Sequence, residues 1–145
     1  MLLLDYLLPE GPLFRSEDYK GTVLVDESDG KCLEIPMAVL VNGGSYSAAE
    51  FFAAALSEYE WAVVVGTQTS GKGYFQVTYR LVDGSAVGLS IGKYTTPNGV
   101  SLQDVGTVPN VVTEVDEQTE YQIYAGILPP EEDPQIQAAV KAILP

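Results

Sequence analysis

The sequence predicts an α/β fold, because two strand-like apolar runs flank one helix and an antiparallel hairpin follows them. Residues 37–41 (MAVLV) and 61–66 (WAVVVG) are continuous apolar runs rich in β-branched residues, which is typical of parallel strands covered on both faces. Residues 47–59 between them are rich in alanine, which favours a helix that approaches its neighbours closely. Residues 37–66 are therefore predicted to form a βαβ unit.

The chain before this unit is predicted to be mostly connecting structure. Leucines at positions 2–8 indicate the buried side of a helix that ends before Pro9, because a proline disfavours helical geometry in the residue ahead of it. The following segments are predicted as a turn-rich loop over 10–21, a strand over 22–25, a tight turn over 26–31 and a short edge segment or connector over 33–36.

The chain after the unit is predicted to begin with an antiparallel hairpin. Residues 74–82 and 86–94 alternate in polarity on either side of an Asp-Gly turn at 83–84. Further segments are predicted as a turn over 95–99, irregular or short-stranded structure over 100–113, acidic loop or helix-start segments over 116–120 and 131–133, and an amphipathic helix from Pro134.

Composition excludes several classes of function. The chain of 145 residues fits one domain, and 7 basic against 20 acidic residues give a net charge of -13, which argues against a nucleic-acid partner. No apolar run approaches the roughly 20 residues of a membrane span. There is no histidine, so a Ser-His-Asp triad is excluded, and the single Cys32 cannot form an internal disulfide. Acid-base chemistry would fall to Lys, Asp, Glu or Tyr.

The loops after the two predicted parallel strands carry the candidate chemistry, since ligands gather at the carboxyl ends of such strands. Residues 66–72 (GTQTSGK) match the first seven positions of a phosphate-binding loop. Gly73 then stands where that motif needs a hydroxyl for magnesium, and the next segment alternates like a strand where the motif needs a helix. A nucleotide site is therefore disfavoured.

Ser47 and Lys72 each have a structural reading and a catalytic one. Ser47 and Glu50 form the pattern of a helix capping box, and Lys72 alone would be a solvated loop residue. Together they suit a serine nucleophile with a lysine base, provided that burial lowers the lysine pKa from about 10.4 towards 7, which costs about 4 to 5 kcal/mol. The amide of Ala48, at the start of the helix, would then be an oxyanion donor.

Three stretches resemble the protease core of the C-terminal processing (tail-specific) peptidases, serine enzymes of the crotonase-like superfamily with a Clp-protease-like core. They are MAVLVNGGSYSAAEFFAAAL, WAVVVGTQTSGKGYFQ and IGKYTTPNGVSLQDVGTVPNVV. The resemblance implies Ser47 as nucleophile, Lys72 as base and Gln76 as the residue that orients the lysine, with Ala48 giving one oxyanion amide. Ser45 is the alternative nucleophile.

The resemblance also implies a function for the whole protein: a serine endopeptidase that cleaves proteins near their C-termini, with protein or peptide substrates and no metal or cofactor. It implies an extracytoplasmic location (cell envelope, periplasm or secreted) and leaves homo-oligomerisation open. The sequence departs from the family pattern at Tyr46, Ala49, Ser70 and Asn110, which bears on substrate preference.

Family members also carry upstream strands, a PGG turn that supplies the second oxyanion amide, and usually a PDZ domain, none of which is in this sequence. Residues 1–145 are therefore expected to be a partial catalytic core domain, incomplete at the N-terminus and impaired in isolation. Two alternatives stay open: a non-catalytic domain that binds extended peptides at exposed strand edges, and an acyl-coenzyme A enzyme on the related crotonase fold.

Overall fold

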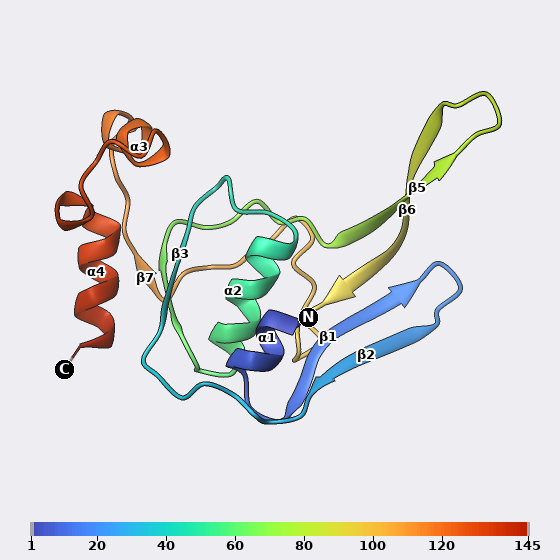
Figure 1. Ribbon diagram of the computed structural model, residues 1–145, viewed down its shortest axis with the longest axis horizontal. Helices are drawn as coiled ribbons and strands as arrows, with labels where there is room; N and C mark the ends of the chain where they lie inside the picture. Colours follow the sequence, from blue (N-terminus) through green and yellow to red (C-terminus); the bar gives the residue numbers. More distant parts are fainter. Residues whose placement is uncertain (1, 145) are drawn as a thin grey trace.

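The protein is built from two β-sheets with one helix, α2 (Ala48–Glu58), packed between them (Figure 1). The computed structural model describes residues 2–144. Ala53 of α2 packs on one sheet with Val41 and Val64, whereas Phe51 and Leu56 belong to a larger apolar cluster with the other sheet. Because α2 contributes to both cores, it fixes the two sheets relative to each other.

The parallel sheet confirms the predicted βαβ unit. It consists of β3 (Ala38–Val41), β4 (Val63–Gly66) and β7 (Val111–Val112), in that order, with Val41 opposite Gly66. The helix α4 (Pro134–Ile143) contacts β3 and β4 as well. Its N-cap is Asp133, whose carboxylate accepts the amide of Gln135. The prediction that both parallel strands are buried on both faces is wrong for β3, which is an edge strand with Leu40 41% exposed.

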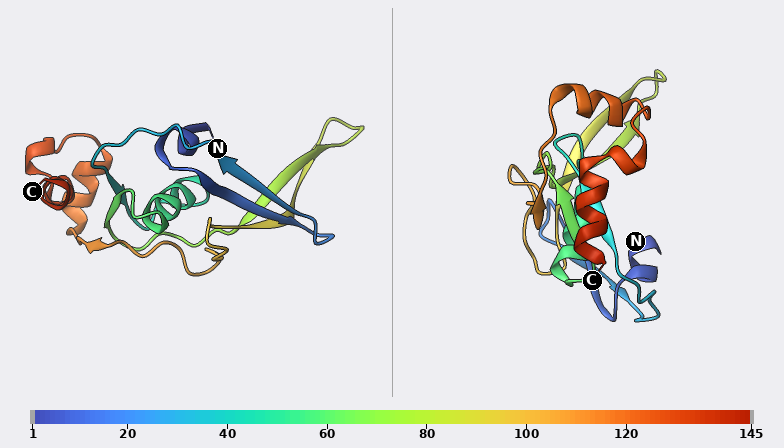
Figure 2. Two further views of the ribbon diagram at one scale, coloured as in Figure 1. Left: turned by 90° about the horizontal axis from the view of Figure 1, so that it is seen from below. Right: turned by 90° about the vertical axis from the view of Figure 1, so that its left-hand side faces the viewer.

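The antiparallel sheet extends away from α2 on the side opposite α4 (Figure 2). Its strands, in spatial order, are β2 (Val23–Ser28), β1 (Gly11–Asp18), β6 (Ala86–Thr95) and β5 (Tyr74–Arg80). The predicted hairpin is confirmed, since Arg80 pairs with Ala86 across the turn. Every residue from 76 to 90 is exposed, so the outer part of this hairpin packs on nothing among residues 2–144.

The predicted loop over 10–21 is wrong, because most of it is strand β1. Although its residues are polar and turn-forming, the segment is a strand that hydrogen bonds to β2 on one side and to β6 on the other. An irregularity in the pairing between Pro12 and Phe14 accommodates the proline. The turn predicted over 26–31 begins later than expected, because β2, paired with β1, continues to Ser28.

Three short helices complete the described chain: α1 (Leu2–Leu7), α3 (Glu117–Tyr124) and the 3₁₀ turn η1 (Pro130–Glu132). The predictions of an N-terminal helix and of a closing helix from Pro134 are confirmed. The predicted burial of the N-terminal leucines is right for Leu4 and Leu8 but wrong for Leu2 and Leu3, which are 80% and 61% exposed. Among residues 2–144, none of the helices has the length and apolar character needed to cross a membrane.

Candidate active site

Ser47 is the N-cap of α2 and has a backbone conformation that is unusual for a residue with a side chain. Its φ is 57° and its ψ is -121°. Such a conformation costs roughly 1 to 3 kcal/mol and concentrates at functional sites, where surrounding structure holds it in place. Ser45 has a different role in the same loop, because its hydroxyl accepts the amide of Asn42 (3.1 Å) and closes the turn after β3.

Ser47 lines an apolar pocket of about 280 Å³. The other side chains of the pocket come from α1, β1, α2, β5 and β6, and are Leu3, Leu4, Phe14, Ala48, Phe51, Phe52, Phe75 and Tyr94. The amide of Ala48 has no acceptor among residues 2–144. An uncommitted amide at the first turn of a helix, next to a half-exposed serine, is the arrangement that an oxyanion site requires.

Lys72 lies in the loop between β4 and β5, where two glycines allow close packing. A Cβ on Gly71 (φ +84°) would lie 2.9 Å from the amide nitrogen of Val105, and one on Gly73 would lie 2.8 Å from that of Gln103. Neither position has room for a side chain. The ammonium of Lys72 lies 5.8 Å from the centre of the Tyr46 ring, a cation–π contact.

Glu50 joins the serine loop to the lysine loop. This carboxylate is fully buried and accepts four hydrogen bonds, from the amides of Ser47 (2.9 Å), Gly71 (2.8 Å) and Lys72 (2.6 Å) and from the hydroxyl of Thr69 (2.7 Å). Burial by itself would raise the pKa of Glu50, but these hydrogen bonds outweigh it and hold the pKa below its ordinary value. An ionised carboxylate therefore ties the two loops together.

The capping-box motif had identified only part of this role. The amide of Ser47 does donate to the side chain of Glu50, as the motif predicts. The other three donors belong to a loop 19 to 22 residues further along the chain. A local sequence pattern carries no information on contacts between residues so far apart. Because Glu50 already fits the capping box, nothing further in the sequence marks it as part of the site.

Tyr94, which sequence reasoning did not single out, contacts the same two loops. Its hydroxyl donates to the carbonyl of Lys72, and its ring lines the apolar pocket with Ser47. Burial raises the pKa of the Tyr94 phenol, the neighbouring Ser47 side chain lowers it, and the charge of Glu50 raises it. Its position inside the quoted stretch IGKYTTPNGVSLQDVGTVPNVV is the only sequence signal that marks it.

Gln76 lies on the exposed part of β5. Its amide nitrogen is 3.4 Å from the hydroxyl of Ser90 on β6, so the described contact of this side chain is across the hairpin. Of the predicted residues, the structure thus brings Ser47, Ala48 and the Lys72 loop to one place, through Glu50 and Tyr94, and directs Gln76 to Ser90.

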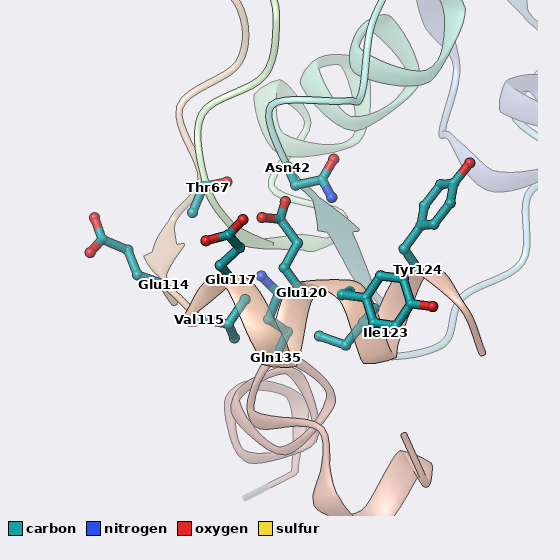
Figure 3. A pocket seen from close by; sticks show the side chains of 10 residues that line it. Asn42, Thr67, Glu114, Val115, Glu117, Glu120, Ile123, Tyr124 and Gln135 are labelled. Carbon is teal, nitrogen blue, oxygen red and sulfur yellow. The ribbon is translucent and has the colours of Figure 1, made fainter. Parts of the chain in front are cut away.

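A separate, larger cleft of about 740 Å³ lies at the carboxyl ends of the parallel strands. Glu117 and Glu120 of α3 point across it towards Asn42 and Thr67 (Figure 3). Its remaining lining residues are Glu114, Val115, Tyr121, Ile123, Tyr124 and Gln135. The Ser47 and Lys72 loops do leave from these strand ends, but Ser47 itself faces the apolar pocket instead.

Comparison with known proteins shows the family of the chain. The model of Peptidase family S41 matches residues 1–113, a range that contains Ser47, Glu50, Lys72 and Tyr94. The chain belongs to peptidase family S41. The S41 chain is 41% identical over 91 residues to a carboxy-terminal-processing protease of Bartonella bacilliformis, a match that covers 63% of the chain and 21% of that relative.

Two further relatives of the S41 chain are C-terminal processing enzymes by name. A chloroplastic C-terminal processing peptidase of Tetradesmus obliquus is 36% identical over 107 residues, covering 72% of the chain and 23% of the relative. The structure of a photosystem II D1 C-terminal processing protease superposes with a TM-score of 0.70 at 33% identity, covering 77% of the chain and 30% of that structure. The S41 chain thus spans less than a third of these relatives' length, and it has their fold.

Proposed function

We propose that this chain carries the nucleophile and base of a serine endopeptidase that cleaves proteins near their C-termini. The observation that supports this most strongly is the buried Glu50, which holds the backbone of Ser47 and that of Lys72 with the same carboxylate. A capping box needs only the first of these contacts. The second has no structural purpose in capping α2, and it ties the backbone of Lys72 to the carboxylate that also holds the strained backbone of Ser47.

In the proposed mechanism Ser47 attacks the carbonyl carbon of the scissile peptide bond and Lys72, in its neutral form, takes the hydroxyl proton. The amide of Ala48 donates to the oxyanion, and the lysine then passes its proton to the leaving amine. Water then attacks the acyl-enzyme, Lys72 takes a proton from the water and returns it to Ser47, and the carboxylate product is released. Gln76 is assigned to hold the Lys72 side chain, which requires its amide to leave Ser90. No metal or cofactor takes part.

The substrate would be an extended polypeptide with an apolar side chain next to the cleaved bond. The pocket beside Ser47 is lined by leucine, phenylalanine and tyrosine side chains and by no charged group, so burial of an apolar side chain there is favourable. A charged side chain in the same place would lose its hydration without gaining a partner.

We further propose that residues 1–145 form part of a larger catalytic core, since the chain spans 21% and 23% of the two named relatives. The second oxyanion amide and a PDZ domain would then lie elsewhere in the protein. One oxyanion donor is typically worth about a hundred- to a thousandfold in turnover, so the isolated chain should be slower by at least that factor. We also propose an extracytoplasmic location, since relatives of the chain include a chloroplastic C-terminal processing peptidase.

The test is cleavage of an unstructured peptide with an apolar C-terminal region by the full-length protein. Ser47→Ala and Lys72→Ala should each lower kcat by about a thousandfold or more, because each removes a reacting group. The exposed Ser85→Ala and Lys141→Ala serve as matched controls and should cleave normally.

A serine-directed fluorophosphonate, mapped by mass spectrometry, identifies the nucleophile directly. Label on Ser47 is expected, and label on Ser45 would move the assignment two residues upstream. Undiminished cleavage by either alanine variant would contradict the Ser-Lys mechanism. Peptide binding by the wild-type protein without turnover or labelling would instead favour the non-catalytic peptide-binding domain.

A further inference from the structure

Tyr94 lies against both halves of the proposed catalytic pair. Its hydroxyl donates a hydrogen bond to the carbonyl of Lys72, and its side chain lines the same apolar pocket as Ser47. Tyr94 lies 22 residues beyond Lys72, on β6 of the antiparallel sheet. The antiparallel sheet therefore holds the backbone of the Lys72 loop through this side chain.

The peptide groups on either side of Lys72 are held by different parts of the protein. The amide donates to Glu50 (2.6 Å), which belongs to α2, and the carbonyl accepts from Tyr94, which belongs to β6. Gly71 and Gly73 are packed too closely against backbone to let the loop slide. With the backbone fixed on both sides, the lysine side chain starts from one defined Cα–Cβ direction.

The ring of Tyr94 is held independently of its hydroxyl. The residue is 4% exposed, its ring stacks on Phe14 with a centroid distance of 5.7 Å, and it meets the edge of Phe51 at the same distance. These contacts involve only ring atoms. Tyr94→Phe would therefore keep the packing and remove only the hydroxyl, with its hydrogen bond to the carbonyl of Lys72.

From these contacts we infer that Tyr94 is a positioning residue for the Ser47–Lys72 pair, a role that rests on the proposed function. Its hydroxyl fixes the Lys72 peptide, and its side chain forms part of the wall of the pocket that Ser47 faces. Tyr94 neither gains nor loses a proton in the reaction. A pair whose members are held this way spends more of its time in the geometry for attack, so the effect falls on kcat.

The first experiment compares Tyr94→Phe with wild type in the full-length protein. We expect kcat to fall about 10- to 100-fold with KM unchanged, and the rate of Ser47 labelling by a fluorophosphonate to fall by a similar factor. Tyr19→Phe, which changes a tyrosine that is 76% exposed in the β1–β2 turn, is the matched control and should behave as wild type. Circular dichroism and thermal unfolding check that the variant is folded.

The second experiment observes the contact without catalysis. In protein labelled with ¹³C at the tyrosine ζ position, the Tyr94 resonance, assigned by its loss in Tyr94→Phe, should shift in Ser47→Ala and stay unchanged in Ser85→Ala. A resonance unmoved by Ser47→Ala would overturn the inference, because Tyr94 and Ser47 would then not be neighbours in the pocket.

The activity outcomes separate this inference from the function it rests on. A Tyr94→Phe enzyme with wild-type kcat overturns the positioning role and leaves the peptidase assignment standing. A raised KM with unchanged kcat also overturns it, since Tyr94 would then only line the pocket. A wild-type protein that neither cleaves peptides nor labels at Ser47 overturns the function, and the inference with it.

Discussion

The loop that carries Lys72 and the tip of the β5–β6 hairpin each contain a glycine in the left-handed conformation, but the first is closely packed and the second is open to solvent. Gly71 and Gly84 have nearly the same left-handed φ, +84° and +87°. A Cβ on Gly71 would meet three backbone atoms at 2.9 to 3.1 Å, whereas one on Gly84 would meet nothing within 4 Å. The same local conformation thus serves close packing at the site and a simple turn at the tip.

The difference extends to the polar groups around each turn. At the tip, Asp83 accepts from the amide and hydroxyl of Ser85, so the turn satisfies itself with neighbours two residues away. In the Lys72 loop, the amides of Gly71 and Lys72 donate to a glutamate on another element. We therefore expect changes at the site to affect the whole fold, and changes at the tip to stay local.

The largest expected effect comes from removing the charge that holds the site together. Glu50→Gln replaces an acceptor of four hydrogen bonds by a group with one oxygen and an NH₂ that faces donors. We expect the free energy of unfolding to fall by roughly 3 to 5 kcal/mol, since buried donors lose their partners. Urea denaturation measures this.

The control for this change is Glu120→Gln, an exposed glutamate on α3, which should alter the free energy of unfolding by less than about 0.5 kcal/mol. Equal stability of the two variants would show that the carboxylate of Glu50 does not bind the loops as described. Cleavage by the full-length Glu50→Gln protein should also fall, because Ser47 and Lys72 lose their common anchor.

The two glycines provide the next test. Gly71→Ala should lower the free energy of unfolding by roughly 2 to 4 kcal/mol, since it combines left-handed strain with overlap against the backbone of Val105 and Gly106. Gly84→Ala carries only the strain and should cost about 1 kcal/mol. The difference between the two losses in the free energy of unfolding gives the contribution of steric overlap at Gly71. Similar losses for both, measured in urea, would mean that the Lys72 loop is free to shift.

The elements that were predicted correctly are those determined by residues close together in the sequence. The βαβ unit, the hairpin at Asp83-Gly84 and the closing helix each follow from periodicity or turn chemistry within a short window. The strand β1 was missed because its strand character comes from its partners β2 and β6, and Pro12 and the charged residues within it read as loop. Leu40 was expected to be buried, since a strand run does not show which strand lies at an edge.

The residues of the candidate site likewise fall into those that local sequence could identify and those that it could not. Ser47 and Lys72 were identified from their residue types and their spacing within a family resemblance, and the structure brings their loops together. The roles of Glu50 and Tyr94 could not be predicted, because they depend on contacts between residues about 20 positions apart on different elements. The strained φ of Ser47 is likewise a property of the assembled loop.

The smallest expected effect is on the pH dependence of stability, and it distinguishes the carboxylate at the site from those at the surface. Hydrogen bonds hold the pKa of Glu50 in the folded protein below its value in the unfolded chain. Its stabilising contribution is therefore complete above the unfolded pKa, and it is lost as the pH falls through the lower, folded value. The stability gap between wild type and Glu50→Gln should be constant from pH 7 to about 5.5 and narrow on further acidification. Urea denaturation across this range measures the gap. A gap that widens in acid would mean that Glu50 is protonated when folded, in which case a neutral side chain and not an anion joins the serine and lysine loops.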